Sequence, residues 1–227
     1  MSGTSGSSDL IVAIRHLSRE RSRLDDRASG LPDAEQAEAA RYIRRDDRDR
    51  FLLGRLLLRE TIASATSRAA ADFTLARDGN GRPFTPDVPE IDINLSHSGD
   101  CVAAVVGRGL SVGIDVELHR SGIDIAAIGR QVFTPHERAH ILAAGSGSVA
   151  AFFRQWTLKE ALVKALGRGF LDDPRRIEIR HETGGVFTPV FVGEGPDDLG
   201  SGWTLRLLDC GDDHAGALAF RPRLGSA

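Results

Sequence analysis

The chain has 227 residues, a formal net charge of −3 and 41% apolar residues, enough for one large domain or two smaller ones with a buried core. The small net charge gives no argument for a general nucleic-acid-binding or membrane-binding surface, and no apolar run is long enough to span a membrane. The first eight residues are small and polar, unlike a signal peptide, and two cysteines are too few for a disulfide framework or a metal knuckle. We therefore expect a cytoplasmic protein with two free thiols, Cys101 and Cys210.

The first hundred residues predict a strand, a long helical region and a turn. Residues 10–14 are a predicted strand, and residues 33–66 carry helical patterning in two pieces, a charged one at 41–50 and an amphipathic one at 51–62. The arginines of the charged piece are equally explained by a solvated face paired with its aspartates. Residues 73–76 are expected to form a short strand before the Asp-Gly-Asn-Gly turn at 78–81, and an apolar strand follows at 101–106.

The segment Ser-Val-Gly-Ile-Asp-Val-Glu-Leu at 111–118 places two carboxylates on one face of a predicted strand. Strand alternation directs the aliphatic side chains to one face and Gly113, Asp115 and Glu117 to the other. Like charges this close repel each other and usually need a cation. Gly113 leaves room there for a close approach. The alternative is that both acids are solvated and without function.

Lysine occurs only twice in the chain, at Lys159 and Lys164, and all other basic residues are arginines. Both lysines fall in one predicted helix, where Glu160 and Lys164 lie one turn apart on one face with Trp156 and Lys159 beside them. Gly167 and Gly169 are expected to end this helix. A solvated Glu–Lys surface pair, worth only a few tenths of a kcal/mol, explains the same spacing. The concentration of both lysines in one segment favours a functional role.

The order of elements in the second half resembles that in the first. After the two acids, short helices are predicted at 125–133 and 135–144, the lysine-bearing helix begins near residue 149, and antiparallel strands follow at 177–180, 186–192, 203–208 and 217–220. The tripeptide Phe-Thr-Pro recurs about a hundred residues apart, beginning at Phe84 and Phe187. The sequence therefore predicts an α/β (α+β) fold of two pseudo-symmetric halves, residues 1–109 and 110–227. Each half is a small antiparallel sheet packed with a long helix, and a ligand cleft lies between them.

Three motifs in order carry a family resemblance: Asn94-Leu-Ser-His-Ser, Gly113-Ile-Asp-Val-Glu and Trp156-Thr-Leu-Lys-Glu-Ala-Leu-Val-Lys, preceded by Gly81-Arg82-Pro83. Together they resemble the signature of the 4′-phosphopantetheinyl transferases, and the length and apparent duplication resemble the surfactin-synthetase-activating type. The resemblance implies transfer of the phosphopantetheine arm of coenzyme A to a serine of an apo acyl or peptidyl carrier protein of fatty-acid, polyketide or nonribosomal peptide synthesis. It also implies release of 3′,5′-ADP, a Mg²⁺ cofactor and a monomer, with no nucleic-acid or membrane partner.

The resemblance assigns roles to particular residues. Asp115, Glu117 and Glu160 would hold Mg²⁺, and Glu160 would also take or relay the proton of the serine. Glu160, Lys164 and His97 would form the catalytic set. The coenzyme A contacts implied are Lys164 and His97 on the pyrophosphate with Lys159 in support, Ser96 and Arg82 on the nucleotide phosphates, and Arg50 near the adenosine end.

The chain departs from the family pattern at several positions. Arg82 stands where the family has lysine, and Glu35 and Glu38 stand where family lysines are expected ahead of the 41–50 segment. The group that binds the 3′-phosphate therefore stays open, with Arg41, Arg44 and Arg45 as candidates. Glu137 matches another recurrent family acid, and its role cannot be derived from the sequence.

Two other classes of protein remain as alternatives. A binding protein of the same fold would dock carrier domains or coenzyme A without transfer, although the intact set of acids and lysines argues against it. A magnesium-dependent phosphohydrolase would use similar acids and need no carrier-docking surface. For the transferase, a compact ammonium at Lys164 should not tolerate arginine, whereas Lys159, expected to point away from the reacting phosphorus, should tolerate it better.

Overall fold

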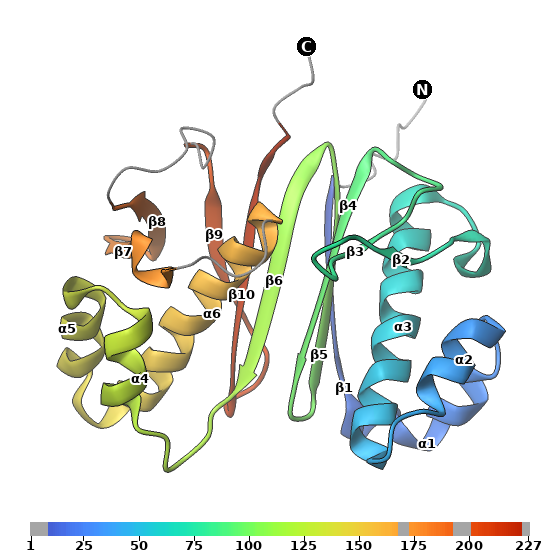
Figure 1. Ribbon diagram of the computed structural model, residues 1–227, viewed down its shortest axis with the longest axis horizontal. Coiled ribbons are helices and arrows are strands. Elements are labelled where there is room, and N and C mark those ends of the chain that lie inside the picture. Colours follow the sequence, from blue (N-terminus) through green and yellow to red (C-terminus); the bar gives the residue numbers. More distant parts are fainter. Residues whose placement is uncertain (1–8, 168–172, 193–200, 224–227) are drawn as a thin grey trace, which may run out of the picture.

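The computed structural model describes residues 9–167, 173–192 and 201–223, and its elements stack in four layers, helix, sheet, sheet and helix (Figure 1). The first half contributes β1 (Leu10–His16), α1 (Leu17–Ala28), α2 (Asp33–Ala39), α3 (Arg45–Thr66), β2 (Ala76–Arg77), β3 (Pro83–Phe84), β4 (Ile91–Ser98) and β5 (Cys101–Arg108). The second half contributes β6 (Leu110–Leu118), α4 (Ile125–Val132), α5 (Pro135–Ala143), α6 (Ser148–Leu166), β7 (Ile177–Glu182), β8 (Val186–Phe191), β9 (Thr204–Leu208) and β10 (His214–Pro222). Short 3-10 turns lie at Ala70–Asp72, Gly145–Gly147 and Pro174–Arg176.

The two sheets come from different parts of the chain. One has the strand order β1-β5-β4 and the other the order β6-β10-β9-β8-β7, and the pairs within each are antiparallel. The change of sheet falls at Gly109, whose φ of 63° permits the tight connection from β5 to β6. The α/β class and the two antiparallel sheets, each with a long helix, are confirmed. The domain boundary itself stays a prediction.

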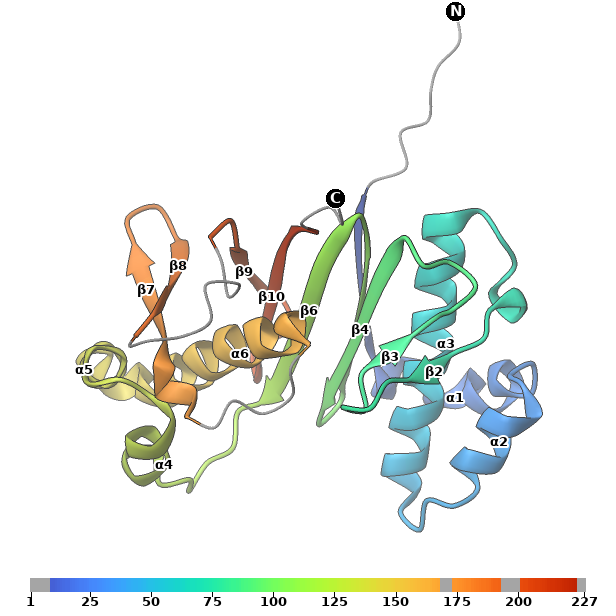
Figure 2. The same cartoon turned by 45° about the horizontal axis from the view of Figure 1, so that its top comes forward.

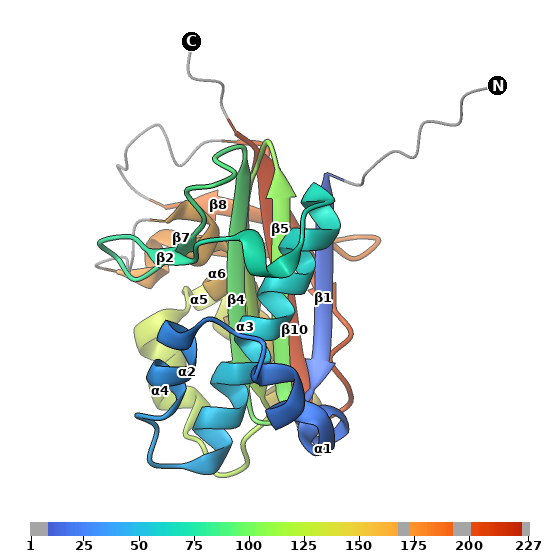
Figure 3. The same ribbon diagram turned by 90° about the vertical axis from the view of Figure 1, so that its right-hand side faces the viewer.

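Strand β5 is buried on both faces, which explains its unbroken apolar sequence. One face packs against α3 through Val102, Ala104 and Val106. The alternate residues, with Cys101 among them, face the second sheet in a separate core that also contains Cys210. Both cysteines are buried free thiols, as expected, but their distance in the sequence gave no sign that they share one core. Figure 3 shows α3 covering the outer face of this sheet, with α1 and α2 outside it.

Side chains of β4 hold the edge of β6, so that the two sheets meet along a polar seam. Four backbone N–H groups of β6, at every second residue, donate to polar side chains at every second residue of β4, at 2.8 to 3.3 Å. The constant offset of twenty residues means that the two strands run parallel. The pairs are Val112 with Asp92, Ile114 with Asn94, Val116 with Ser96 and Leu118 with Ser98.

Helix α6 lies directly on β6 at Gly113. A Cβ atom at this position would lie 2.1 Å from the carbonyl oxygen of Ala161 and 2.4 Å from the backbone nitrogen of Ala165. The room expected at Gly113 is therefore filled by α6, and this contact brings the helix against the strand that carries the two acids. The helix ends at Leu166 and is capped by Gly167, which has a φ of 69°, as predicted, while Gly169 lies outside the described residues.

Several local predictions were wrong. Helix α1 was not predicted; its first turn is capped by Asp100, which accepts from the backbone N–H and the hydroxyl of Ser18, both at 2.7 Å, and this partner is 82 residues away. Residues 40–44 interrupt the helical region inside the charged stretch. Residues 73–75 are not a strand, because β2 begins at Ala76. Strand β4 carries the Asn-Leu-Ser-His-Ser motif and was not assigned.

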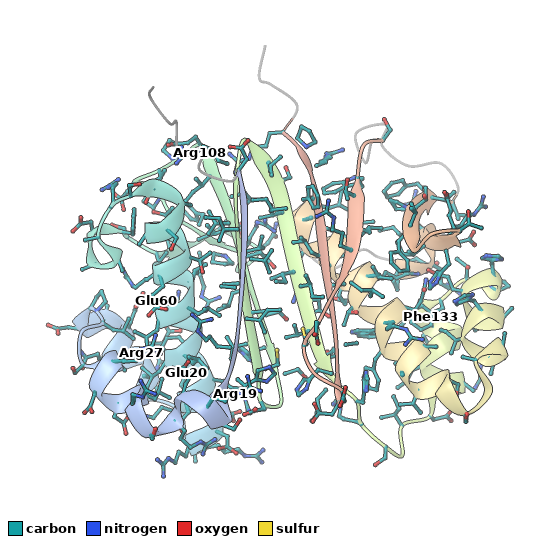
Figure 4. All side chains as sticks on the ribbon, turned by 180° about the vertical axis from the view of Figure 1, so that it is seen from behind. Arg19, Glu20, Arg27, Glu60, Arg108 and Phe133 are labelled. Atoms are coloured by element: carbon teal, nitrogen blue, oxygen red, sulfur yellow. The ribbon has the colours of Figure 1, made fainter. Side chains whose placement is uncertain are left out.

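Ion pairs join α1 to α3 within the first half. Arg27 of α1 donates to Glu20 of the same helix and to Glu60 of α3, and Figure 4 shows the three side chains together on the back of the molecule. Across the described ranges, no helix is both long and apolar enough to cross a membrane. The polar tail at residues 1–8 lies outside the described residues.

Candidate active site

A cavity of about 480 Å³ lies over β4, walled by α3 on one side, α6 on the other and the β2–β3 hairpin. Figure 2 shows β4 and this hairpin between the two long helices. The wall on the α6 side carries Glu160 and Lys164, and β4 contributes Ser96 and His97. The Asn-Leu-Ser-His-Ser motif and the lysine-bearing helix, which are far apart in the sequence, therefore meet in one cavity.

Lys164 links the two halves at the floor of the cavity. Its Nζ donates to Oδ1 of Asp115 at 2.6 Å and to Oγ of Ser96 at 2.9 Å, and the Ser96 hydroxyl donates to the same Asp115 oxygen at 3.0 Å. Burial raises the pKa of Asp115, while Lys164 and Ser96 oppose that shift. Ser96 is thus part of the seam and of the charged site at once, because its Oγ also accepts from the N–H of Val116.

Glu117 and Glu160 add carboxylates next to this pair. Oε2 of Glu117 accepts from the hydroxyl of Ser98 at 2.8 Å. Burial raises the pKa of Glu160, and the negative charges of Asp115 and Glu117 raise it further. Burial and the charge of Asp115 also raise the pKa of Glu117. The charge of Asp115 thus raises the pKa of both glutamates, so the three predicted metal ligands share one electrostatic environment.

The residues present suit a hard divalent cation. Oδ2 of Asp115 is buried and has no hydrogen-bond partner among the described residues, so a buried oxygen ligand is available next to two further carboxylates. Within the same ranges, no group of three or more histidine, cysteine, aspartate or glutamate side chains is arranged to hold a metal ion. Lys164 supplies the positive charge beside Asp115 in this conformation. The assignment of Asp115, Glu117 and Glu160 as ligands stays a prediction.

His97 lies at the cavity among positive charges. Desolvation lowers its pKa, and the charges of Arg50 and Lys164 lower it further. The neutral form of its ring is therefore favoured until an anion enters. Arg50 does not line the cavity; its guanidinium donates to the carbonyl of Gly99 at 3.1 Å and to Asp47.

Arg82 lines the cavity but is held by protein groups. Its Nη2 donates to Oδ2 of Asp92 at 2.7 Å and to the carbonyl of Val112 at 2.6 Å, and its Nη1 donates to the carbonyl of Lys164 near the end of α6. Arg82 therefore connects the hairpin, the seam and the end of α6. The predicted contact with a nucleotide phosphate stays a prediction.

Lys159 is not in the cavity, in contrast to the expected coenzyme A contact. Its side chain is 2% exposed, and its Nζ donates to Oε2 of Glu137 at 2.8 Å and to the carbonyls of Val132 and Pro174 at 2.9 and 3.1 Å. Three acceptors use all three ammonium donors, so none is left for a ligand. The ammonium also lies 5.3 Å from the ring centroid of Phe133, labelled in Figure 4.

Glu137, whose role the sequence left open, is the centre of this buried network. One carboxylate oxygen accepts from Gln155 at 2.8 Å and from the N–H of Ile179 at 2.9 Å. The other accepts from Lys159 and from the N–H of Thr134, which completes the capping box of α5. The side chain is fully buried, and it joins α5, α6 and β7. The network fixes the rotation of α6, so that Glu160 and Lys164 face the cavity.

Comparison with known proteins shows which family this sequence matches. The N-terminal profile of 4′-phosphopantetheinyl transferases matches residues 18–108, and the profile of the 4′-phosphopantetheinyl transferase superfamily matches residues 111–219. The AcpT 4′-phosphopantetheinyl transferase of Salmonella typhi is 34% identical over 142 residues, which cover 62% of this chain and 68% of that protein. The chain belongs to the 4′-phosphopantetheinyl transferase superfamily. Other members resemble it over different lengths: a phosphopantetheinyl transferase of Thraustochytrium is 29% identical over 88% of this chain and 72% of its own length.

Coverage of the other superfamily members varies. The chain spans 57% of the psf-1 transferase of Bacillus pumilus, with 35% identity over 59% of its own length. A crystal structure of holo-ACP-synthase from Plasmodium yoelii is 20% identical over 49% of this chain and 92% of that one, with a TM-score of 0.41.

Two arginines of the cavity wall were missed at the sequence level. Arg55 of α3 and Arg77 of β2 both line the cavity, whereas Arg41, Arg44 and Arg45, the candidates for the 3′-phosphate, do not. Arg45 instead pairs with Asp49 on α3 at 3.6 Å. The sequence signal for Arg55 is a charge within the leucine-rich part of α3.

Proposed function

We propose that this chain transfers the 4′-phosphopantetheine arm of coenzyme A to a serine hydroxyl of an apo acyl or peptidyl carrier protein and releases 3′,5′-ADP. The observation that carries the proposal is the meeting of Glu160, Lys164 and His97 in one cavity at the seam of the two halves. Family membership supports the reaction class. The cavity joins cationic groups for phosphates with a carboxylate of raised pKa, which the transfer needs.

The chemistry assigned to each residue follows from its charge and position. The serine oxygen attacks the β-phosphorus of coenzyme A, which carries the pantetheine arm, and the bond from that phosphorus to the bridging oxygen breaks as 3′,5′-ADP leaves. Glu160 takes or relays the serine proton, since its raised pKa brings it closer to the working pH of a general base. Lys164 and His97 hold the pyrophosphate oxygens and stabilise the charge that develops on them.

A magnesium ion is the cofactor we propose for Asp115, Glu117 and Glu160. When bound, Mg²⁺ would offset the negative charge of the pyrophosphate. The support in this chain is Oδ2 of Asp115, which is buried and has no hydrogen-bond partner among the described residues, together with Glu117 and Glu160, whose pKa values are raised by burial and by the charge of Asp115.

The proposed enzyme acts as a cytoplasmic monomer. The cavity residues His97, Glu160 and Lys164 all come from one chain, which supports a monomer. The two buried free thiols are consistent with a reducing compartment.

Mass spectrometry of an apo carrier protein tests the proposal directly. The protein is incubated with the carrier, coenzyme A and Mg²⁺, and transfer is read as the added mass of the phosphopantetheine arm. We expect that mass with the parent chain, and none with Asp115→Ala or with a chelator in place of Mg²⁺. Binding of carrier without added mass would instead favour a non-catalytic docking protein, and release of phosphate without a modified carrier would favour a phosphohydrolase.

A further inference from the structure

His214 is a buried histidine that does not line the cavity but contacts the turn after the Asn-Leu-Ser-His-Ser motif. It is the first residue of β10, its side chain is 1% exposed, and its Nε2 lies 3.1 Å from the carbonyl oxygen of Ser98. A carbonyl oxygen can only accept, so this ring nitrogen donates. The other nitrogen, Nδ1, lies 2.6 Å from Oδ1 of Asp213, and this hydrogen bond lowers the pKa of that carboxyl. Both ring nitrogens of His214 therefore have a fixed partner.

The turn between β4 and β5 packs directly on this ring. Gly99 has a φ of 55°, and a Cβ atom there would lie 3.1 Å from Nε2 of His214 and 3.0 Å from Cδ2 of Leu118. A larger residue would push the turn away from the histidine. The next carbonyl of the turn, that of Gly99, accepts from Arg50 at 3.1 Å. Two consecutive carbonyls are thus held by one donor from each half, His214 of β10 and Arg50 of α3.

Ser98 carries this fixed position over to Glu117. Its hydroxyl accepts from the N–H of Leu118 at 3.1 Å and donates its one hydrogen to Oε2 of Glu117 at 2.8 Å. The same carboxylate oxygen lies 3.8 Å from the guanidinium of Arg120, whose side chain is 63% exposed. Glu117 therefore has two rival partners, a serine held in place by backbone contacts and an exposed arginine. Without the hydrogen bond from Ser98, the carboxylate is free to turn to Arg120.

We infer that His214 is a positioning residue for Glu117 and acts through Ser98. The inference rests on the proposed function, in which Glu117 is a ligand of Mg²⁺, and goes beyond it by giving a role to a residue of β10 outside the cavity wall. By holding the Ser98 carbonyl, the imidazole fixes the serine, and the serine hydroxyl keeps the Glu117 carboxylate beside Asp115. Loss of a group that orients a metal ligand typically lowers metal affinity about 10- to 100-fold.

Two amides at position 214 test the hydrogen bond to Ser98. In His214→Gln the amide nitrogen takes the place of Nε2 and still donates to Ser98, whereas in His214→Asn the shorter amide takes the place of Nδ1 and reaches only Asp213. Affinity for Mn²⁺, which takes the same oxygen ligands as Mg²⁺, is measured by electron paramagnetic resonance of the free ion, with coenzyme A bound and no carrier. His214→Asn should weaken Mn²⁺ binding about tenfold or more, and His214→Gln should stay close to the parent. Asp213→Asn, which changes the exposed partner on the other nitrogen, is the matched control and should keep the parent affinity.

A double-mutant cycle tests the route through the serine. Ser98→Ala removes the hydroxyl that binds Glu117 and should weaken Mn²⁺ binding by about the same factor as His214→Asn. If His214 acts through Ser98, adding His214→Asn to Ser98→Ala should cost little more. Arg120→Met should also recover more affinity in the His214→Asn variant than in the parent, because the rival partner is gone. Losses that multiply in the double variant would show two independent effects and would overturn the inference.

Thermal melts separate positioning from stability. If Mn²⁺ affinity follows the melting temperature of the variants and not the presence of a donor to Ser98, His214 only supports the fold and the inference is wrong. Should His214→Asn fail to fold, Ser98→Ala and His214→Gln decide the question. Parent affinity in Ser98→Ala, or a loss in His214→Gln as large as that in Ser98→Ala, would then contradict the route.

Transfer to an apo carrier is measured separately, so the inference and the proposed function can fail independently. His214→Asn should raise the Mg²⁺ concentration for half-maximal transfer about tenfold or more, and lower kcat at saturating Mg²⁺ much less. If the parent transfers nothing while its Mn²⁺ affinity depends on His214 as described, the proposed function fails and the inference stands. If the parent transfers but binds no Mn²⁺, or if His214→Asn leaves both metal constants unchanged, the inference is wrong.

Discussion

Lys159 and Lys164 lie five residues apart on α6, and their ammonium groups lie in opposite kinds of environment. Lys164 is 30% exposed and reaches the cavity, where it pairs with Asp115 and Ser96. Lys159 is 2% exposed, on the far side of the helix, and pairs with Glu137 and two backbone carbonyls. One has an opening to a ligand, whereas the other has all its donors occupied.

The difference shows that chemistry and positioning are divided between two faces of one helix. The cavity face carries groups that cost stability, because Glu160 is desolvated beside other acids. The buried face carries a fully satisfied ion pair, which holds α6 in one rotation. Changes on the first face should alter transfer with little effect on folding, and changes on the second should do the reverse.

The largest expected effect comes from Glu160→Gln on the cavity face. Loss of a general base lowers rates by about 10² to 10⁴. The melting temperature should not fall, since burial and the charges of Asp115 and Glu117 already disfavour the ionised carboxylate. Transfer is measured by initial rates and folding by thermal melts, with the exposed Glu182→Gln as control. A slow variant that is also strongly destabilised would remove the distinction between the two faces.

On the buried face, Lys159→Met should unfold the protein more easily. It leaves the fully buried carboxylate of Glu137 without its cation, and breaking a buried pair in this way costs about 3 to 5 kcal/mol. Adding Glu137→Gln should recover much of the loss, because the remaining amide is neutral. Urea denaturation of the parent, both single variants and the double variant gives the coupling free energy between Lys159 and Glu137. A loss below about 1 kcal/mol for Lys159→Met would mean that the network does not hold the helix.

Part of the geometry around the cavity could be predicted from the sequence, because each motif is short and lies in one element. Period-two alternation put Asp115 and Glu117 on the same face of β6, and helical spacing put Glu160 beside Lys164. The packing of α6 on Gly113 then brings Glu160 and Lys164 to the strand that carries the two acids.

The positions that could not be predicted depend on contacts between distant segments. Lys159 looked like a ligand contact because its acid partner, Glu137, lies 22 residues away on another helix. Ser96 accepts from both the backbone of β6 and Lys164 because β4 runs parallel to β6. No local sequence pattern predicts that the two strands approach each other. Arg55 lies in the leucine-rich part of α3, and its place in the cavity wall depends on how that helix packs.

A smaller effect is expected from His97→Ala. The neutral ring gains a proton or a hydrogen bond when the pyrophosphate enters, so its loss should raise the KM for coenzyme A by about tenfold, with kcat changed less. Saturation curves for coenzyme A at fixed carrier concentration give both constants. Unchanged coenzyme A affinity in the variant would contradict a contact between His97 and the pyrophosphate.

The smallest expected effect is on the pH dependence of stability, through His181 at the edge of the buried network around Glu137. Desolvation and the charges of His140, Arg154 and His136 lower the pKa of His181 to about 4, while its unfolded-state value is near 6.5. The unfolded chain therefore binds this proton first, and stability should fall as the pH drops from 6.5 towards 4. His181→Gln should reduce the difference in melting temperature between pH 7 and pH 5. An equal or larger difference in the variant would show that His181 does not contribute.

The most direct measurement replaces each lysine by arginine and records transfer and stability together. Lys164→Arg should keep the parent melting temperature and lose about a hundredfold in rate, because a longer planar group displaces the pyrophosphate by about 1 Å. Lys159→Arg should lower the free energy of unfolding by about 1 to 3 kcal/mol through overpacking, while the folded fraction still transfers. The sequence predicted that Lys159 would tolerate arginine better than Lys164. We now expect that tolerance for the transfer rate but not for the stability of the fold. Parent-like transfer by Lys164→Arg, or a rate loss in Lys159→Arg without loss of stability, would contradict the division of α6 into two faces.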